Sequence, residues 1–584
     1  MNSRTKTGFE IIQVAVVLGL LADILLRQTP WGLNVLLFNV AFVVGVLALV
    51  RRRGPQLLDL QTGSLLAAQM FFAAMFVWRD SIQLRLADSL AILAVLSVLF
   101  LSRLKVAPRL AGVAHFLVGF VWSAFSSFIG PLLLVFSDVK WGALPQAGWR
   151  KHTFSVLRGV LLALPLILIF GALFIAADAA FEGMVARVLD IQFDIVFSHI
   201  FLVMAFGWLS AGYLRGVLIN PVGFAQPEAP SAQAHSGEEV APDESRVDRF
   251  ARETGEHPVT LGDHTVVEHL NISDPPGVEE PAAKTDTAAS YKWDWAKIDN
   301  TILPPAVTLG SVEVAIILGL MNLLFLSFVI IQVPYLFGGM ELVQSTPDFK
   351  LADYARRGFG ELVAVSALVL PVLLMGHWLI RKDGKLAHNL FRILAGTQIV
   401  LLFVIMASAV QRLVILTGAM GYGMTRLRLY PLIFMVWMAA VFVWFAVTVL
   451  RGARQHFAWG AMWLAFGIIG LTHLLNPDEF IVKTNLALKL AGRPFDVYYN
   501  KELSQDAIPI LLSSLPELNR AEQCSVRNAL DIGITLNGEN SNDFRSWNIS
   551  RLRAASLVNA DPMSEQDREY CRGYTPVAND DFLH

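Results

Sequence analysis

The chain has 584 residues, of which 55% are hydrophobic and only 16% are charged, and its formal net charge is −2. A soluble domain carries roughly 25% charged residues, so this composition argues against a protein whose whole surface faces water. The near-neutral charge offers no general electrostatic footprint for nucleic acid, and no such partner is expected. Two cysteines are too few for a thiolate zinc cluster or a disulfide-dense scaffold, and we expect no cofactor and no metal.

Long apolar blocks indicate that lipid is the main solvent and the main partner of this chain, because a spanning helix needs about 20 predominantly apolar residues. We therefore expect an all-α polytopic membrane protein with about eleven or twelve transmembrane helices. The first block follows Arg4 and Lys6 without a small-x-small cleavage site, so we interpret it as a retained helix. The expected spans are 9–27, 31–50, 64–78, 88–102, 111–137, 155–177, 197–218, 308–333, 359–380, 390–411, 427–450 and 456–475.

Changes in composition divide the chain into four parts. Residues 222–300 contain 16 acidic and 6 basic residues with few large aliphatics, which predicts a disordered acidic linker over 219–303. The linker separates a first transmembrane block, 1–218, from a second, 304–475. From 476 to 584 the polarity is ordinary, and we expect a small, mostly helical soluble C-terminal domain with helices near 510–515, 520–530 and 546–557.

Lysine and arginine in short loops mark the cytoplasmic side of a membrane protein. Basic loops of this kind lie at residues 51–53, 103–109, 381–385 and 451–454. Twelve full crossings cannot place all four loops on the cytoplasmic side. The hypothesis that reconciles them lets the block at 111–137 dip in and return to the same side, with Gly130-Pro131 as the break. Eleven crossings then leave the linker inside and the C-terminal domain outside, although Arg412, Arg426 and Arg428 also lie outside, which the rule disfavours.

No catalytic signature is present: there is no H-E-x-x-H, G-x-S-x-G, P-loop or dinucleotide fingerprint. Polar residues at membrane depth are more informative, because each is costly there and usually faces other helices or a cavity. The candidate intramembrane polar site consists of Arg357, Glu361, His377, Gln411, Arg412, Arg426 and Arg428.

Several interpretations of these residues remain open. Arg357 and Glu361 are four residues apart, so they lie on one helical face and can form an ion pair. Alternatively, Glu361 is a titrating or ligand-binding carboxylate, since an unpaired carboxylate inside a span costs a few kcal/mol. His377 is either a hydrogen-bonded bundle residue or a proton relay, and the arginines at span ends can simply extend toward lipid headgroups.

Cys524 and Cys571 both lie in the expected C-terminal domain. A disulfide between them is plausible if the domain is extracytoplasmic, because oxidising compartments preserve such bonds. The alternative is two unrelated thiols in a reducing compartment.

Several stretches together resemble a bacterial membrane family of unknown function, the related groups numbered 4153 and 4173. The resemblance is carried by Tyr354-Ala-Arg-Arg-Gly-Phe-Gly-Glu-Leu362, by Gln411-Arg412 and by Gly421-Tyr-Gly-Met-Thr-Arg-Leu-Arg428. It also includes the C-terminal motif residues Asn476, Asp478, Asn485, Ser504 and Asp506. The resemblance implies a multi-pass protein of the bacterial cytoplasmic (inner) membrane, and it brings no activity with it.

The leading hypothesis is a non-enzymatic envelope sensor or assembly scaffold that couples a helical bundle to the C-terminal domain, with an envelope or signalling protein as partner. The first alternative is a secondary transporter or ion-coupled carrier, because interrupted helices such as the one with Pro371 often form substrate sites. A membrane-embedded enzyme that uses Asp348, Asp353 and Glu361 for acid–base chemistry is a third alternative.

Overall fold

The computed structural model describes residues 3–27, 30–53, 59–101, 106–139, 193–219, 308–337, 359–380, 385–419, 423–538 and 543–572. All of these residues belong to one unit, formed by Met1–Gly223 and Trp295–His584. Their regular structure is helical, apart from one isolated bridge between Leu309 and Ile380. Within these ranges, 11 helices are long and apolar enough to cross a membrane. The expected span at 155–177, the acidic linker and Arg357 lie outside the described residues.

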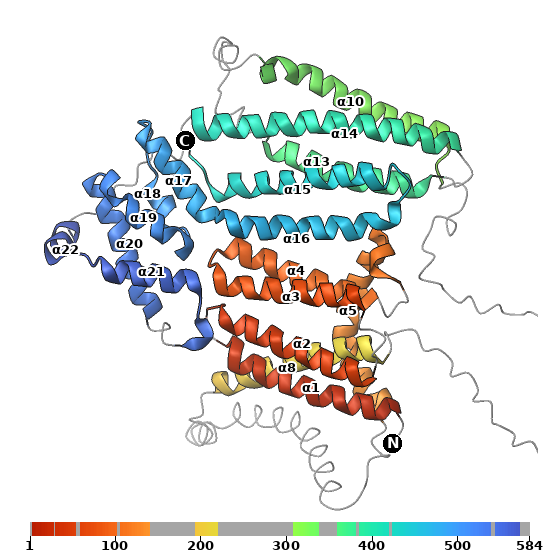
Figure 1. Cartoon of the computed structure of the whole chain (residues 1–584), viewed down its shortest axis with the longest axis horizontal. Coiled ribbons are helices and arrows are strands. Elements are labelled where there is room, and N and C mark those ends of the chain that lie inside the picture. Colours follow the sequence, from red (N-terminus) through yellow and green to blue (C-terminus); the bar gives the residue numbers. More distant parts are fainter. Residues whose placement is uncertain are drawn as a thin grey trace, which may run out of the picture. The chain divides into compact units, whose positions relative to one another are not determined.

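The first block of long helices consists of α1 (Ser3–Leu26), α2 (Leu33–Arg53), α3 (Leu60–Trp78), α4 (Ile82–Leu101), α5 (Val113–Leu133) and α8 (Phe193–Leu218). Helices α1 to α4 pack against one another in chain order, and α8 packs along α1 (Figure 1). The close approach of α1 and α8 depends on Gly19, because a Cβ atom there would lie 2.4 Å from the carbonyl oxygen of Val203. Small residues allow membrane helices to approach in this way.

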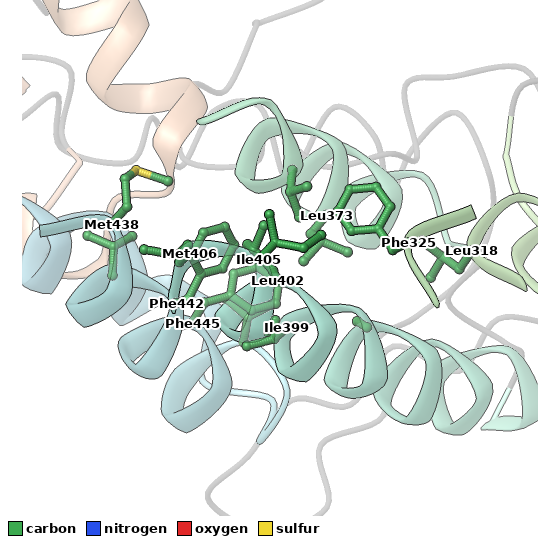
Figure 2. Close-up of a cluster of buried hydrophobic side chains, with 14 of the residues drawn as sticks. Leu318, Phe325, Leu373, Ile399, Leu402, Ile405, Met406, Met438, Phe442 and Phe445 are labelled. Atoms are coloured by element: carbon green, nitrogen blue, oxygen red, sulfur yellow. The ribbon is translucent and has the colours of Figure 1, made fainter. Parts of the chain in front are cut away.

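The second block consists of α10 (Ser311–Phe337), α13 (Phe359–Leu379), α14 (Lys385–Val414), α15 (Arg426–Thr448) and α16 (Phe457–Leu475). Its core is a cluster of buried side chains from α10, α13, α14 and α15, with Phe391, Phe442 and Phe445 almost fully buried. Figure 2 shows how ten of these residues converge between the helices. Helix α16 packs against α4 and so joins the two blocks.

Large apolar side chains remain exposed on the outer faces of these helices. On α10, for example, Leu323, Leu324, Ile330 and Ile331 are each more than 60% exposed. Contiguous apolar surface of this kind is rare on soluble proteins and is what a lipid-facing helix presents. The chain is therefore a multi-pass membrane protein.

Helices α3 and α4 are longer than the sequence predicts. We expected spans at 64–78 and 88–102, and the helices begin at Leu60 and Ile82. Polar residues lie in or just before the extra turns and have partners: Asp59 caps α3 by accepting the N–H of Thr62 at 2.8 Å, and Arg85 in the first turn of α4 binds Asp80. Because of these polar residues, the apolar blocks in the sequence are shorter than the helices.

Helix α5 packs against α8 and α4 near the end of the first block where the chain begins (Figure 1). Near its start, Gly119 lies against Leu101 at the end of α4. After its last turn, the π-helix η4 (Leu134–Asp138) places Asp138 2.8 Å from Arg4 at the start of α1. Both ends of α5 therefore lie at the same end of the block.

The expected break at Gly130-Pro131 is wrong. Helix α5 continues through Pro131 to Leu133 before the π-helix begins. Gly130 serves a packing role instead, because a Cβ atom there would lie 2.8 Å from the Cα atom of Gly212 on α8.

Beyond α16 the chain forms the C-terminal helices, which are α17 (Pro477–Leu490), α18 (Val497–Lys501), α19 (Ile508–Ser514), α20 (Arg520–Gly538), α21 (Ile549–Ala560) and α22 (Glu565–Arg572). Helices α19, α20 and α21 confirm the three helices predicted in this region. Buried apolar residues such as Val482, Leu511 and Val526 give these helices a core of their own. They lie at the end of the long helices opposite the N-terminus (Figure 1).

Candidate functional site

The chain turns sharply between α16 and α17 at Asn476. Its φ of 50° is in the left-handed region, which asparagine tolerates better than most residues, and Pro477 then starts α17 with the fixed φ that a first helical position favours. The side-chain amide of Asn476 donates to Glu479 Oε2 at 2.7 Å and to the carbonyl oxygen of Asp506 at 3.5 Å. The corner thus fixes the direction of the first C-terminal helix.

Asp478, in the first turn of α17, binds the start of α15. Its fully buried carboxylate accepts two bonds from Arg426, from Nε at 2.9 Å and from Nη2 at 2.6 Å. It also accepts the backbone N–H of Ser504 at 3.1 Å and the Ser504 hydroxyl at 2.5 Å. A two-point Arg–carboxylate pair fixes both distance and orientation, so Asp478 holds three segments together.

Asp506, in the 3₁₀ turn η10 (Gln505–Ala507), binds the turn between α3 and α4. Its Oδ2 atom accepts the backbone N–H of Asp80 at 2.8 Å and that of Ser81 at 3.0 Å. Arg79 approaches Oδ1 at 3.5 Å, and the hydroxyl of Ser550 donates to the same oxygen. The first N–H groups of a helix have no partner within the helix, and here a buried carboxylate supplies one.

The segment before and within α21 binds the other side of the same turn. Asn548 donates to the carbonyl oxygens of Phe76 at 2.8 Å and Arg79 at 3.0 Å, which are the open acceptors at the end of α3. Arg551 donates through Nε to Asp80 Oδ1 at 2.7 Å, and Arg85 binds the same carboxylate. The C-terminal helices therefore satisfy both the donors and the acceptors of the α3–α4 turn.

A third contact holds the loop that precedes α15. Asn485 on α17 accepts the N–H of Met424 at 2.6 Å and donates to the carbonyl oxygen of Met424 at 3.0 Å. Gly423 has a φ of 71°, and a Cβ atom there would lie 2.7 Å from Asn485 Oδ1. Only glycine fits this position without strain, and Arg428 closes the loop by donating to the Gly423 carbonyl oxygen.

We call this assembly the polar joint. It connects the first block, the second block and the C-terminal helices through buried or half-buried charged groups. It consists of Arg79, Asp80, Ser81, Arg426, Asp478, Ser504, Asp506, Asn548 and Arg551.

The polar joint contains two buried, paired carboxylates. Its carboxylates at Asp478 and Asp506 have no side-chain exposure, and each has an arginine partner. Removing one partner of a buried pair typically costs about 3–5 kcal/mol, because the other charge is left unpaired away from water. At its edge, burial raises the pKa of Glu479, but hydrogen bonds from Lys483 and Asn476 outweigh it and leave the pKa below its usual value.

The carboxylates of the polar joint are engaged by donors from the chain itself. Among the described residues, no three His, Cys, Asp or Glu side chains are grouped so that they could hold a metal ion. The carboxylates are occupied by arginine, hydroxyl and backbone N–H donors.

A second buried polar contact lies between the two blocks, and sequence reasoning missed it. Asp88 on α4 and His473 on α16 have no side-chain exposure, and His473 Nε2 lies 3.1 Å from Asp88 Oδ2. An ionisable residue inside an apolar helix is a signal that could have identified each of them. Their pairing, across 385 residues, could not be read from the sequence.

The structure brings together most of the predicted polar residues near the C-terminal helices. Arg426, Asp478, Ser504 and Asp506 are part of the polar joint, and Arg428, Asn476 and Asn485 surround it.

The remaining predicted residues lie on other segments. Glu361 is exposed in the first turn of α13, and Gln411 and Arg412 lie in the last turn of α14. His377, near the end of α13, packs against His388 and Phe391 with ring centroids 6.3 and 5.3 Å apart.

The two cysteines are close in the structure. Cys524 on α20 and Cys571 on α22 are joined by a disulfide, with their Cα atoms 5.2 Å apart. Both side chains are buried. The bond ties the last described helix to the core of the C-terminal helices.

The model of a family described as Domain of unknown function (DUF4153) matches residues 65–242 and 287–514. These regions cover more than half of the chain. The chain belongs to this family. The match includes Arg79, Asp478 and Asp506 but ends before α20, so the disulfide lies beyond it. No curated protein and no solved structure matches the chain.

Proposed function

We propose that this member of the DUF4153 family is a non-enzymatic membrane protein that couples its helical bundle to a C-terminal domain, as an envelope sensor or an assembly scaffold. The observation that carries the proposal is the polar joint. Asp506 binds the α3–α4 turn of the first block, and Asp478 binds the start of α15 in the second. A displacement of the C-terminal helices must therefore strain turns of both blocks.

The proposal places the protein in the bacterial cytoplasmic membrane, with the C-terminal helices as a water-exposed domain outside. A disulfide between Cys524 and Cys571 is what an oxidising compartment preserves. Two arginines at this end of the bundle have structural partners, because Arg79 is paired with Asp506 and Arg426 with Asp478.

Coupling in this scheme is mechanical. The backbone of the α3–α4 turn is hydrogen-bonded on both sides by side chains of the C-terminal helices, Asp506 on one and Asn548 on the other. A partner that moves these helices changes the ends of α3 and α4 directly. The coupling passes through contiguous hydrogen bonds and ion pairs, which are a physical route for communication between sites.

A partner-capture experiment tests the proposal. A photo-crosslinking residue replaces Tyr570, which is 53% exposed on α22, in cells that express the full chain. The expected result is one dominant protein adduct that is lost when Asp506→Ala disrupts the polar joint. The matched control places the crosslinker at Leu324, a lipid-facing residue of α10 that is 65% exposed. Absence of any adduct above that control, in intact membranes and after gentle solubilisation, contradicts the proposal.

A second candidate function is an ion-coupled carrier, and the buried Asp88–His473 contact favours it. Ionisable pairs inside membrane helices often form proton or ion pathways. The full chain in sealed vesicles should then carry a proton flux that Asp88→Leu abolishes. Flux no greater than that of protein-free vesicles removes this candidate.

A further inference from the structure

Asp88 and His473 are fully buried where α4 of the first block meets α16 of the second. The imidazole bridges two acceptors. Its Nε2 atom lies 3.1 Å from Asp88 Oδ2, and its Nδ1 atom lies 2.9 Å from the carbonyl oxygen of Ile469. No partner for the other Asp88 oxygen, Oδ1, is found in the described part of the chain.

These contacts fix the number of protons on the pair. A carbonyl oxygen only accepts, so Nδ1 of His473 must carry a hydrogen atom. The contact between Nε2 and Oδ2 then needs one further proton, either on the nitrogen beside a carboxylate or on the oxygen beside a neutral imidazole. Both arrangements have zero net charge. Without that proton, two lone pairs would face each other and an unbalanced negative charge would remain inside the membrane helices.

The groups around Asp88 and His473 have partners of their own. Trp78 stacks on the imidazole with centroids 6.5 Å apart, and Arg79 donates to the His473 carbonyl oxygen at 2.8 and 3.0 Å. The ionisable groups nearby on the packed elements have their own partners. They are Arg79 with Asp506, Asp80 with Arg85 and Arg551, Arg426 with Asp478, Glu479 with Lys483, and Tyr430 with Ser81.

We propose that Asp88 and His473 form a proton-binding site that stabilises the contact between α4 and α16 while one proton is shared between them. This inference goes beyond the coupling function and does not depend on it, because the site lies between the two helical blocks. The ligand is the proton itself, and its occupancy is linked to the contact between the blocks.

Linkage gives the sign and the range of the pH dependence. In separated helices, aspartate and histidine titrate near ordinary pKa values of about 3.9 and 6.5. Between these values, the separated pair also holds one proton, so the contact does not depend on pH. Above about pH 6.5 the separated state loses its proton, and the contact weakens by up to about tenfold per pH unit, roughly 30-fold at pH 8. Below about pH 4 the separated state binds a second proton, and the contact weakens again.

Distance measurements between spin labels on the full chain in lipid nanodiscs test this. Labels are attached at Leu86→Cys on α4 and Leu471→Cys on α16, which are 62% and 60% exposed, while the native cysteines remain bonded. The expected result is a second, longer distance whose population grows from pH 6.5 to 9. In Asp88→Asn this growth disappears, because an amide N–H donates to neutral His473 at every pH.

Asp23→Asn is the matched control. Asp23 also contacts a histidine, His199, at 2.5 Å, but that histidine is 48% exposed at the edge of the first block. This variant should keep the wild-type pH dependence. Distances that do not change between pH 5 and 9, or a pH dependence that persists in Asp88→Asn, overturn the proposal.

Nitrogen-15 NMR of histidine in the unsubstituted chain provides a test that needs no variant at Asp88. His473 is assigned as the resonance lost in His473→Gln. The expected spectrum shows Nδ1 protonated throughout pH 5–8 in the associated state. An unprotonated Nδ1 in that state would falsify the proton count on which the site depends.

Discussion

The carboxylate of Asp506 accepts the backbone N–H of Ser81 at 3.0 Å, although 425 residues of sequence separate them. Ser81 precedes the first turn of α4, whose N–H groups have no partner within the helix. A side chain near the end of the chain therefore completes a helix pair near its beginning. This relationship makes the C-terminal helices part of the bundle's own structure.

Replacing Asp506 should destabilise the whole described unit. Asp506→Ala removes the carboxylate that pairs with Arg79 and accepts the N–H groups of Asp80 and Ser81, and we expect a loss of about 3–5 kcal/mol of unfolding free energy. Thermal unfolding of the full chain in detergent or nanodiscs measures it. Asp567→Ala, on the surface of α22, is the control and should have no measurable effect. Equal effects of the two substitutions would show that Asp506 is not a connecting residue.

Gly423→Ala should weaken the loop before α15. A side chain at a φ of 71° costs about 1–2 kcal/mol, and the added Cβ atom would also displace Asn485. Gly396→Ala is the control, because nothing lies within 4 Å of a Cβ atom there and alanine favours the helix by up to about 1 kcal/mol. The account requires the two substitutions to shift the melting temperature in opposite directions, or only the first to lower it.

Reduction should loosen the C-terminal helices without unfolding the long helices. The disulfide closes a loop with a sequence separation of 47, which in the chain-entropy model stabilises the folded state by about 4 kcal/mol. The double variant Cys524→Ser/Cys571→Ser should be cleaved in α20–α22 by a protease that spares the oxidised wild type. Reductant should make the wild type as sensitive as the variant and leave the variant unchanged.

Glu479 should contribute a small pH-dependent stabilisation. Burial raises the pKa of Glu479, but hydrogen bonds from Lys483 and Asn476 lower it by a larger amount. The pKa is therefore below its usual value. A lowered pKa in the folded state means that the stabilisation is present above the unfolded pKa, about 4.3, and is lost as the pH falls through the folded value. The melting temperatures of wild type and Glu479→Gln should therefore differ at pH 6 and converge at low pH. High salt should reduce the difference, because the pair is partly exposed.

The membrane character could be predicted from the sequence, because lipid as a solvent imposes long apolar blocks. The prediction was least complete where polar residues occur inside helices. Arg85, for instance, lies in the first turn of α4, which the expected span 88–102 leaves out, and it is paired with Asp80, so it interrupts the apolar pattern but not the helix. The predicted break at Pro131 was wrong for a different reason. A proline near the end of a helix can be accommodated, and here α5 continues through Pro131 to Leu133 before the π-helix begins.

The polar joint could be predicted only in part. Arg426, Asp478 and Asp506 were predicted as candidate residues because they belong to recognisable stretches near the C-terminal helices. Arg79 and Arg551 were not predicted, since a charged side chain at a helix end usually extends toward water or lipid headgroups and indicates no particular partner. Their role depends on contacts between distant parts of the chain, which no local pattern encodes.

Hydrogen–deuterium exchange of the full chain in nanodiscs tests the central claim most directly. The comparison is between wild type, Asp506→Asn and Asp478→Asn, with amides followed in three places: the α3–α4 turn, the start of α15 and the C-terminal helices. The account predicts that either substitution increases exchange in all three, because the polar joint connects them. An increase confined to the C-terminal helices would contradict it, since those helices would then be attached to the bundle without being coupled to it.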